Sequence, residues 1–81
     1  MPVVLREGGV RYLFYANEGA PGEPPHVHAI NNGIDAKFWL GPPARMAYND
    51  GHDARTLRQM MQSVDANGAL FMEAWCDFFE V

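Results

Sequence analysis

The segment from His26 to Leu40, "HVHAINNGIDAKFWL", constrains the fold of this chain more than any other. Its centre, Asn32-Gly33, is the strongest short signal for a β-hairpin, because both residue types accept the positive φ angles of a type I′ turn. A two-residue turn also fixes which residues of the two strands face each other. The expected pairs are Ile30 with Asp35, His28 with Lys37, and His26 with Trp39.

This register sorts the hairpin into two different surfaces, because successive residues of a strand point to opposite faces of a sheet. One face is apolar and consists of Val27, Ala29, Ala36 and Phe38. The other face carries groups that can do chemistry, namely His26, His28, Asp35, Lys37 and Trp39. A shift of the register by one residue would undo this separation.

A second hairpin is predicted at the start of the chain. Two segments rich in strand-forming residues, "PVVLRE" and "VRYLFYA", flank Gly8-Gly9, which can form the turn. The expected pairs are Glu7 with Val10, Leu5 with Tyr12, and Val3 with Phe14, and the last two pairs form one apolar face. Arg6 then lies opposite Arg11 on the other face. Two like charges in this arrangement are mildly unfavourable unless an anion lies near them.

The rest of the chain predicts loops and two helices. Asn17–Pro25 is rich in Gly and Pro and predicts a loop, and Arg45–Tyr48 predicts a short fifth strand or a turn. Asp53 is a typical helix N-cap, and Asn67-Gly68 is a typical helix end. Apolar residues recur at helical spacing both before and after Asn67-Gly68, which predicts one helix on each side of it. They are Leu57, Met60, Met61 and Val64 in the first helix, and Phe71, Ala74, Trp75, Phe78 and Phe79 in the second.

These elements predict one α+β domain over residues 1–81. It has two layers: an antiparallel sheet of four strands, or five, and two C-terminal helices packed on one face. The helices are expected on the face that carries Leu5, Tyr12, Phe14, Val27 and Phe38. The opposite face is expected to be open to solvent or to a partner, and it carries Arg6, Arg11, His26, His28, Lys37 and Trp39.

Composition narrows the classes of function. Six basic and ten acidic residues give a net charge of −4, so no DNA binding is expected and non-specific attraction to phosphate backbones is weak. One cysteine, Cys76, excludes an internal disulfide and fits a reducing cytoplasmic location. The sequence shows neither a signal peptide nor an apolar segment of membrane-spanning length.

The histidine pair has three interpretations. His26, His28 and Lys37 are candidate catalytic residues of a small metal-independent ribonuclease, with Arg6 and Arg11 binding the anionic substrate, since imidazole moves protons near neutral pH. In the second interpretation the imidazoles are structural and bond loop carbonyls. In the third the two histidines hold a metal, with Asp35 or the more distant His52 as further ligands. His-x-His alone is weak evidence for a metal, and neither a metal nor a cofactor is expected.

Three further residues are candidate binding residues. Tyr15 and Asp35 lie on the same predicted face as the histidines. Trp39 does too, and a Trp away from the core is typical of an interface. Because a small sheet with open edges tends to pair, a homodimer is expected.

Four motifs in order, "YLFYANE", "PPHVHA", "AKFWL" and "EAWCDFF", resemble a small bacterial and archaeal family of domains of unknown function, numbered four-one-six-zero. The resemblance covers essentially the whole chain. The matching positions are Tyr15, Asn17, Glu18, Pro24, Pro25, His26, His28, Ala36, Lys37, Trp39, Leu40, Glu73, Ala74 and Trp75. The chain departs from the family pattern at Ala16, which replaces Ser, at Cys76, which replaces Asn, and in a longer loop before the histidines.

The resemblance implies no agreed activity. It implies genes that lie beside a second small family in a toxin–antitoxin-like arrangement, often on mobile elements such as integron gene cassettes. The sequence therefore predicts an interaction module of such a two-protein system, acting as a homodimer or with a small partner protein encoded nearby. A ribonuclease or RNA-binding protein that uses the His-x-His face is the alternative, and a metal-binding protein is a further one. The sequence leaves open whether the protein is an enzyme.

Overall fold

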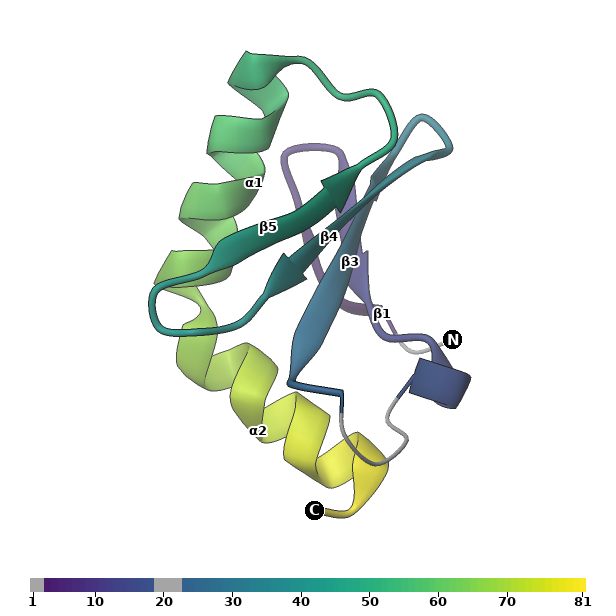
Figure 1. Ribbon diagram of the computed structural model, residues 1–81, viewed down its shortest axis with the longest axis vertical. Helices are drawn as coiled ribbons and strands as arrows, with labels where there is room; N and C mark the ends of the chain where they lie inside the picture. The colour runs from purple at the N-terminus through teal and green to yellow at the C-terminus, as the bar shows by residue number, and fades with distance from the viewer. Residues whose placement is uncertain (1–2, 19–22) are drawn as a thin grey trace.

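Both predicted hairpins are present in the computed structural model, which describes residues 3–18 and 23–81 (Figure 1). The strands are β1 (Val3–Glu7), β2 (Val10–Leu13), β3 (His26–Asn31), β4 (Ile34–Trp39) and β5 (Arg45–Asn49). They form one antiparallel sheet in the order β1-β2-β3-β4-β5. A short 3-10 helix, η1 (Ala16–Glu18), follows β2, and the chain ends with α1 (Ala54–Ala66) and α2 (Gly68–Phe79).

The register of the central hairpin is as predicted. Asn32 and Gly33 both have positive φ, 53° and 76°, as a type I′ turn requires. His28 faces Lys37 and His26 faces Trp39, and Ile30 faces Asp35. The two-residue turn therefore places the histidines and the lysine on one face, away from Val27 and Phe38.

The first hairpin matches the prediction except at its open end. Gly8 and Gly9 form the turn, and the expected pairs Glu7–Val10, Arg6–Arg11 and Leu5–Tyr12 are all present. The predicted pair of Val3 with Phe14 is wrong, because Val3 faces Leu13 instead. The register shifts between Val3 and Leu5, since β1 carries an extra residue there, as in a β-bulge.

The segment after Pro43 forms a fifth strand. β5 pairs with β4, with Lys37 opposite Tyr48 and Trp39 opposite Arg45. The tight connection before it depends on Gly41, whose φ is 73° and where a Cβ atom would lie 2.0 Å from the carbonyl oxygen of Pro43. The sheet thus has two edge strands, β1 and β5.

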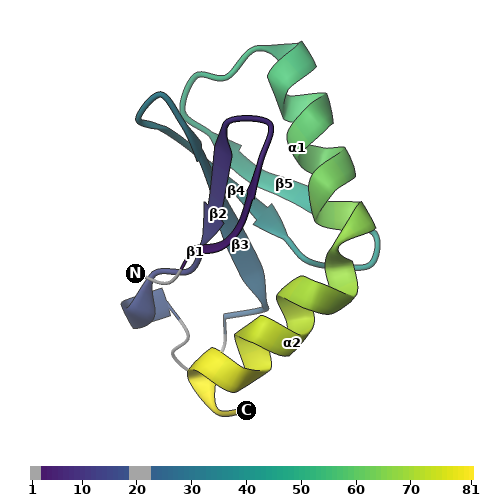
Figure 2. The same cartoon turned by 180° about the vertical axis from the view of Figure 1, so that it is seen from behind.

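The two helices cover the predicted face of the sheet (Figures 1 and 2). Asp53 caps α1 by accepting a hydrogen bond at Oδ1 from the backbone N–H of Thr56, at 2.8 Å. α1 ends at the C-cap Asn67, and α2 begins at the next residue. Contacts between the layers are aromatic: the ring of Tyr12 lies 5.7 Å from that of Phe71, and Phe14 lies 5.4 Å from Trp75. The fold is therefore the predicted two-layer α+β domain with five strands.

Candidate functional site

The face opposite the helices is not open at the histidines. His26 and His28 are both 0% exposed and Lys37 is 9% exposed, so the prediction that these side chains face solvent is wrong. Leu13, which pairs with His28 across β2 and β3, is also fully buried. The ring of Tyr15, from the segment that follows β2, lies 4.1 Å from the His28 ring. Leu13 at the end of β2 and Tyr15 just after it therefore cover this part of the sheet.

His28 belongs to a polar cluster that joins three strands. Its Nδ1 atom lies 3.2 Å from both carboxylate oxygens of Asp35 on β4. Tyr48, on β5, donates its hydroxyl hydrogen to Asp35 Oδ2 at 2.7 Å, and its oxygen lies 3.4 Å from His28 Nδ1. A carboxylate at Nδ1 fixes the orientation of an imidazole and favours the tautomer with its proton on Nδ1. The cluster has the composition of an acid–base pair, and it also ties the edge strand to the centre of the sheet.

His26 lies in an aromatic cage at the start of β3. Its Nδ1 donates to the carbonyl oxygen of Pro24 at 3.0 Å, which is the loop-carbonyl bond of the structural interpretation. The His26 ring lies 5.0 Å from the ring of Trp75 on α2, 5.7 Å from Trp39 and 5.4 Å from His28. His26 is therefore a junction between the sheet and the second helix.

The positive charge of Lys37 is paired with a carboxylate within the fold. Its Nζ atom forms an ion pair with Oε1 of Glu23 and lies 4.6 Å above the ring of Trp39. Glu23 Oε1 is also 3.9 Å from His26 Nδ1. Trp39 is half-buried rather than fully exposed. The loop before β3 thus supplies the negative charge for this part of the face.

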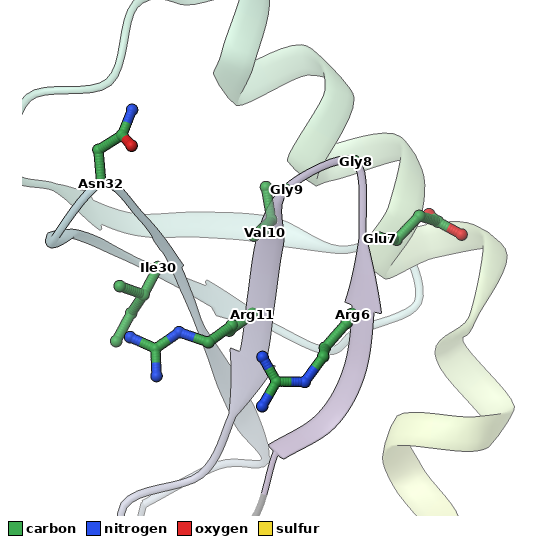
Figure 3. A pocket seen from close by; sticks show the side chains of 8 residues that line it. All are labelled: Arg6, Glu7, Gly8, Gly9, Val10, Arg11, Ile30 and Asn32. Atoms are coloured by element: carbon green, nitrogen blue, oxygen red, sulfur yellow. The ribbon is translucent and has the colours of Figure 1, made fainter.

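Arg6 and Arg11 lie apart from the histidine cluster. They pair across β1 and β2 at the wall of an open hollow of about 380 Å³ beside the Gly8-Gly9 turn (Figure 3). Both side chains are exposed. The structure therefore divides the predicted anion-binding face into a buried cluster around the histidines and an exposed arginine pair.

Of the two further metal ligands suggested by the sequence, Asp35 contacts His28, whereas His52 does not join the histidines. Among the side chains described for residues 3–17 and 23–81, no three His, Cys, Asp or Glu form a group that could hold a metal ion. His52 instead bonds the carbonyl oxygen of Ile34 through Nε2, at 2.9 Å. Cys76 is a partly buried free thiol on α2.

Three members of the site were not predicted from the sequence as site residues. Tyr48 enters because β5 is a strand, which the sequence left open. Glu23 lies in a loop, where spacing gives no information about contacts. Trp75 was assigned to the core, and it contacts both Phe14 in the core and His26 in the site.

Comparisons with known proteins identify a family for this chain but give no relative of known function. No curated protein and no solved structure matches the chain. In the part of the chain that is described, no helix is long and apolar enough to cross a membrane. A family model, "Domain of unknown function (DUF4160)", matches residues 9–76, which include the histidine cluster, Arg11 and most of α2. The chain belongs to this family.

Proposed function

We propose that this protein is an interaction module of a toxin–antitoxin-like two-protein system, and that it acts as a homodimer formed through β5. The observation that supports this proposal is that β5 is an edge strand with exposed apolar and aromatic side chains. β5 is an edge of the sheet, and Met46 and Tyr48 on it are 47% and 38% exposed. An edge strand with unpaired backbone groups and exposed apolar side chains is a template for pairing with another chain.

The other edge is less suited to pairing. The exposed residues of β1 are Arg6 and Glu7, and charged side chains on an edge oppose the addition of a further strand. No large apolar side chain of β1 is among the exposed ones. The contrast between the two edges favours β5 as the interface.

The sequence of β5 is complementary to itself in an antiparallel pair. A two-fold axis at Ala47 would place Met46 of one copy opposite Tyr48 of the other, and Arg45 opposite Asn49. Ala47 is an extra residue in the register of β5 with β4, so Met46 lies on the face of Phe38 and Tyr48 on the face of Lys37. An isologous interface requires this kind of self-complementarity. Like charges directly opposite each other would destabilise a pair of strands. This pairing has no like charges opposed.

The buried histidine cluster has a role in this proposal. Tyr48 of β5 is bonded to Asp35 of β4, and Asp35 contacts His28 of β3. The cluster holds the edge strand in a fixed position, and a preorganised edge loses less entropy on pairing. The histidines thereby serve binding without contacting the partner.

The test is the state of association of purified protein. Sedimentation equilibrium is expected to show a dimer for the wild type and a monomer for Met46→Lys, because a charge on the edge blocks pairing. Leu70→Lys is the matched control, since Leu70 is similarly exposed, 44%, but lies on α2. A monomeric wild type, or a Met46→Lys variant that stays dimeric, would contradict the proposal.

The second protein of the system is tested by co-expression with the product of the adjacent gene. Co-elution of the two proteins through size exclusion, in a complex that retains two copies of this chain, is the expected result. A chain that elutes alone in the presence of that product would remove the two-protein part of the proposal and leave the dimer.

A second candidate function is RNA cleavage, and the contact between His28 and Asp35 is what favours it. A carboxylate-oriented imidazole can act as a general base, and Lys37 could stabilise a developing phosphate charge. Both groups are buried and paired, so the covering segment would have to move for RNA to reach them. If this candidate is correct, the wild type is expected to cleave RNA in the presence of a chelator. The Asp35→Asn variant is expected to lose this cleavage while its far-ultraviolet circular dichroism is unchanged. Cleavage that persists in that variant would exclude it.

A further inference from the structure

The pair formed by Arg6 and Arg11 is an unusual feature of the sheet, because it opposes two positive charges. The two residues are direct partners in the register of β1 and β2. Figure 3 shows both side chains extending to the same side, with the Arg11 guanidinium reaching toward Ile30 and the Arg6 guanidinium lying next to β2. Like charges directly opposite in a strand pair are destabilising. This arrangement becomes favourable when an anion lies between the two groups.

The fold supplies no such anion in the part of the chain that is described. Among the side chains described for residues 3–17 and 23–81, no carboxylate lies within ion-pair distance of either guanidinium group. Among the described residues that line the hollow, Glu7 is the acidic one, and its side chain points away from the arginines (Figure 3). Its Oε1 atom accepts a hydrogen bond from the hydroxyl of Ser63 on α1. The carboxylate is thus held on the other side of the hairpin, and the arginine side is left positive.

Space for a ligand exists beside the two guanidinium groups. The hollow has a volume of about 380 Å³, and it is lined further by Ile30 and Asn32 from the neighbouring strand and turn. Pockets that bind small molecules start at roughly 300 Å³. Neither Gly8 nor Gly9 places a side chain over it. Besides Glu7 and the two glycines, the wall therefore combines two strong cationic donors, one amide side chain and the two apolar side chains of Val10 and Ile30.

We infer that Arg6 and Arg11 form a binding site for a phosphate group, separate from the histidine cluster. The planar guanidinium presents paired N–H donors whose spacing matches two oxygens of a phosphate, and two guanidinium groups can hold its remaining oxygens. The ligand is a small one or a chain end. The net charge of −4 repels a long polyanion, whereas a single phosphate group needs only the local positive charge. The phosphate belongs to a small phosphate ester or to the 5′ end of an RNA.

This inference does not depend on dimerisation through β5, because the arginines lie on the opposite half of the sheet, on β1 and β2. It also does not depend on catalysis by the histidines. The site can therefore be tested on the wild-type chain whatever its oligomeric state.

Calorimetric titration with pyrophosphate is the first measurement. Wild-type protein is expected to bind, and Arg6→Gln and Arg11→Gln are each expected to weaken binding by about tenfold, as for the loss of one charged hydrogen-bonding group. Arg58→Gln removes the same charge from an exposed position on α1, outside the hollow, and is expected to bind as the wild type does. No heat of binding for the wild type at millimolar pyrophosphate, or equal weakening by Arg58→Gln, would overturn the inference.

A second measurement distinguishes the two sources of the phosphate. A short single-stranded RNA with a 5′ phosphate is titrated beside the same RNA with a 5′ hydroxyl. Binding of the phosphorylated RNA alone assigns the site to RNA ends, and binding of pyrophosphate with neither RNA assigns it to small esters. Equal binding of both RNAs would mean contacts to the backbone and would overturn the assignment to a single phosphate group. Backbone amide shifts of Gly8 and Gly9 in nuclear magnetic resonance spectra, unchanged on saturation, would overturn the location.

Discussion

Tyr48 on the edge strand and Asp35 on its neighbour are joined by a hydrogen bond of 2.7 Å, and the same carboxylate meets His28 Nδ1 at 3.2 Å. Three strands are thus linked through one carboxylate whose residue is only partly buried. The contact connects the His26-x-His28 motif with the strand that we assign to association.

Replacing Tyr48 by Phe removes the hydroxyl and leaves the ring. The variant is expected to lose about 1 kcal/mol of unfolding free energy, because one hydrogen bond to a charged but partly exposed group is lost. Its dimer is also expected to dissociate more readily, since β5 is less firmly held. Urea denaturation and sedimentation measure the two effects. Met46→Leu, on the same strand, should change neither by a comparable amount, and a Tyr48→Phe variant as stable as the wild type would show that the cluster does not support β5.

The N-cap of α1 makes a pH-dependent contribution to stability. Hydrogen bonding from the Thr56 backbone lowers the pKa of the Asp53 carboxyl below its ordinary value. A carboxyl whose pKa is lower in the folded state stabilises the fold above its unfolded pKa, and this contribution disappears as the pH falls through the folded pKa. Asp53→Asn keeps a capping oxygen without the charge.

At neutral pH, thermal denaturation is expected to rank wild type above Asp53→Asn and Asp53→Ala lowest. The advantage of the wild type over Asp53→Asn is expected to shrink in acid and to vanish below the folded pKa. An advantage that is constant from neutral to acid pH would mean that the charge of Asp53 contributes nothing.

The arginine pair gives a prediction in the absence of any ligand. Arg11→Gln removes one of two opposed charges at exposed positions, so the variant is expected to be more stable than the wild type by about 0.2–1 kcal/mol. The difference should decrease in high salt, which screens exposed charges. A variant that is less stable than the wild type at low salt would mean that the pair is compensated within the fold.

Much of this fold follows from local signals. Asn32-Gly33 fixes the whole register of the central hairpin, because a two-residue turn leaves no freedom in which residues face each other. Asp53 and the helical spacing from Leu57 to Val64 locate α1 in the same way. The predicted pairing of Val3 with Phe14 was wrong because β1 contains a bulge. The sequence does not indicate this bulge, since position 4 is a valine and not a glycine or proline.

The candidate site was less predictable than the fold. The residues on its face were identified correctly, since alternation depends on the register alone. Their burial was not, because it comes from Tyr15, Trp39 and Trp75, which reach the histidines from three separate elements. Contacts of this kind depend on tertiary packing, which local patterns do not encode. The catalytic roles of His26, His28 and Lys37 stay predictions.

Gly41 and Gly8 offer a comparison between two glycines of similar φ. Gly41 has φ of 73° and Gly8 has φ of 59°, so an alanine at either position pays the cost of the left-handed conformation, roughly 1–2 kcal/mol. Only at Gly41 would the new Cβ also overlap the backbone of Pro43 and Ala44, at 2.0 Å and 2.8 Å, while nothing lies within 4 Å at Gly8.

Backbone atoms cannot move aside as a flexible side chain can, so Gly41→Ala is expected to distort the connection into β5. We expect Gly41→Ala to lower the thermal midpoint well beyond the effect of Gly8→Ala and to weaken dimerisation, whereas Gly8→Ala should leave the dimer intact. Calorimetric denaturation and sedimentation of the two variants decide this. Equal losses of stability in the two variants would show that the backbone around Gly41 accommodates a Cβ atom without a further loss of stability. The position of β5 would then not depend on Gly41.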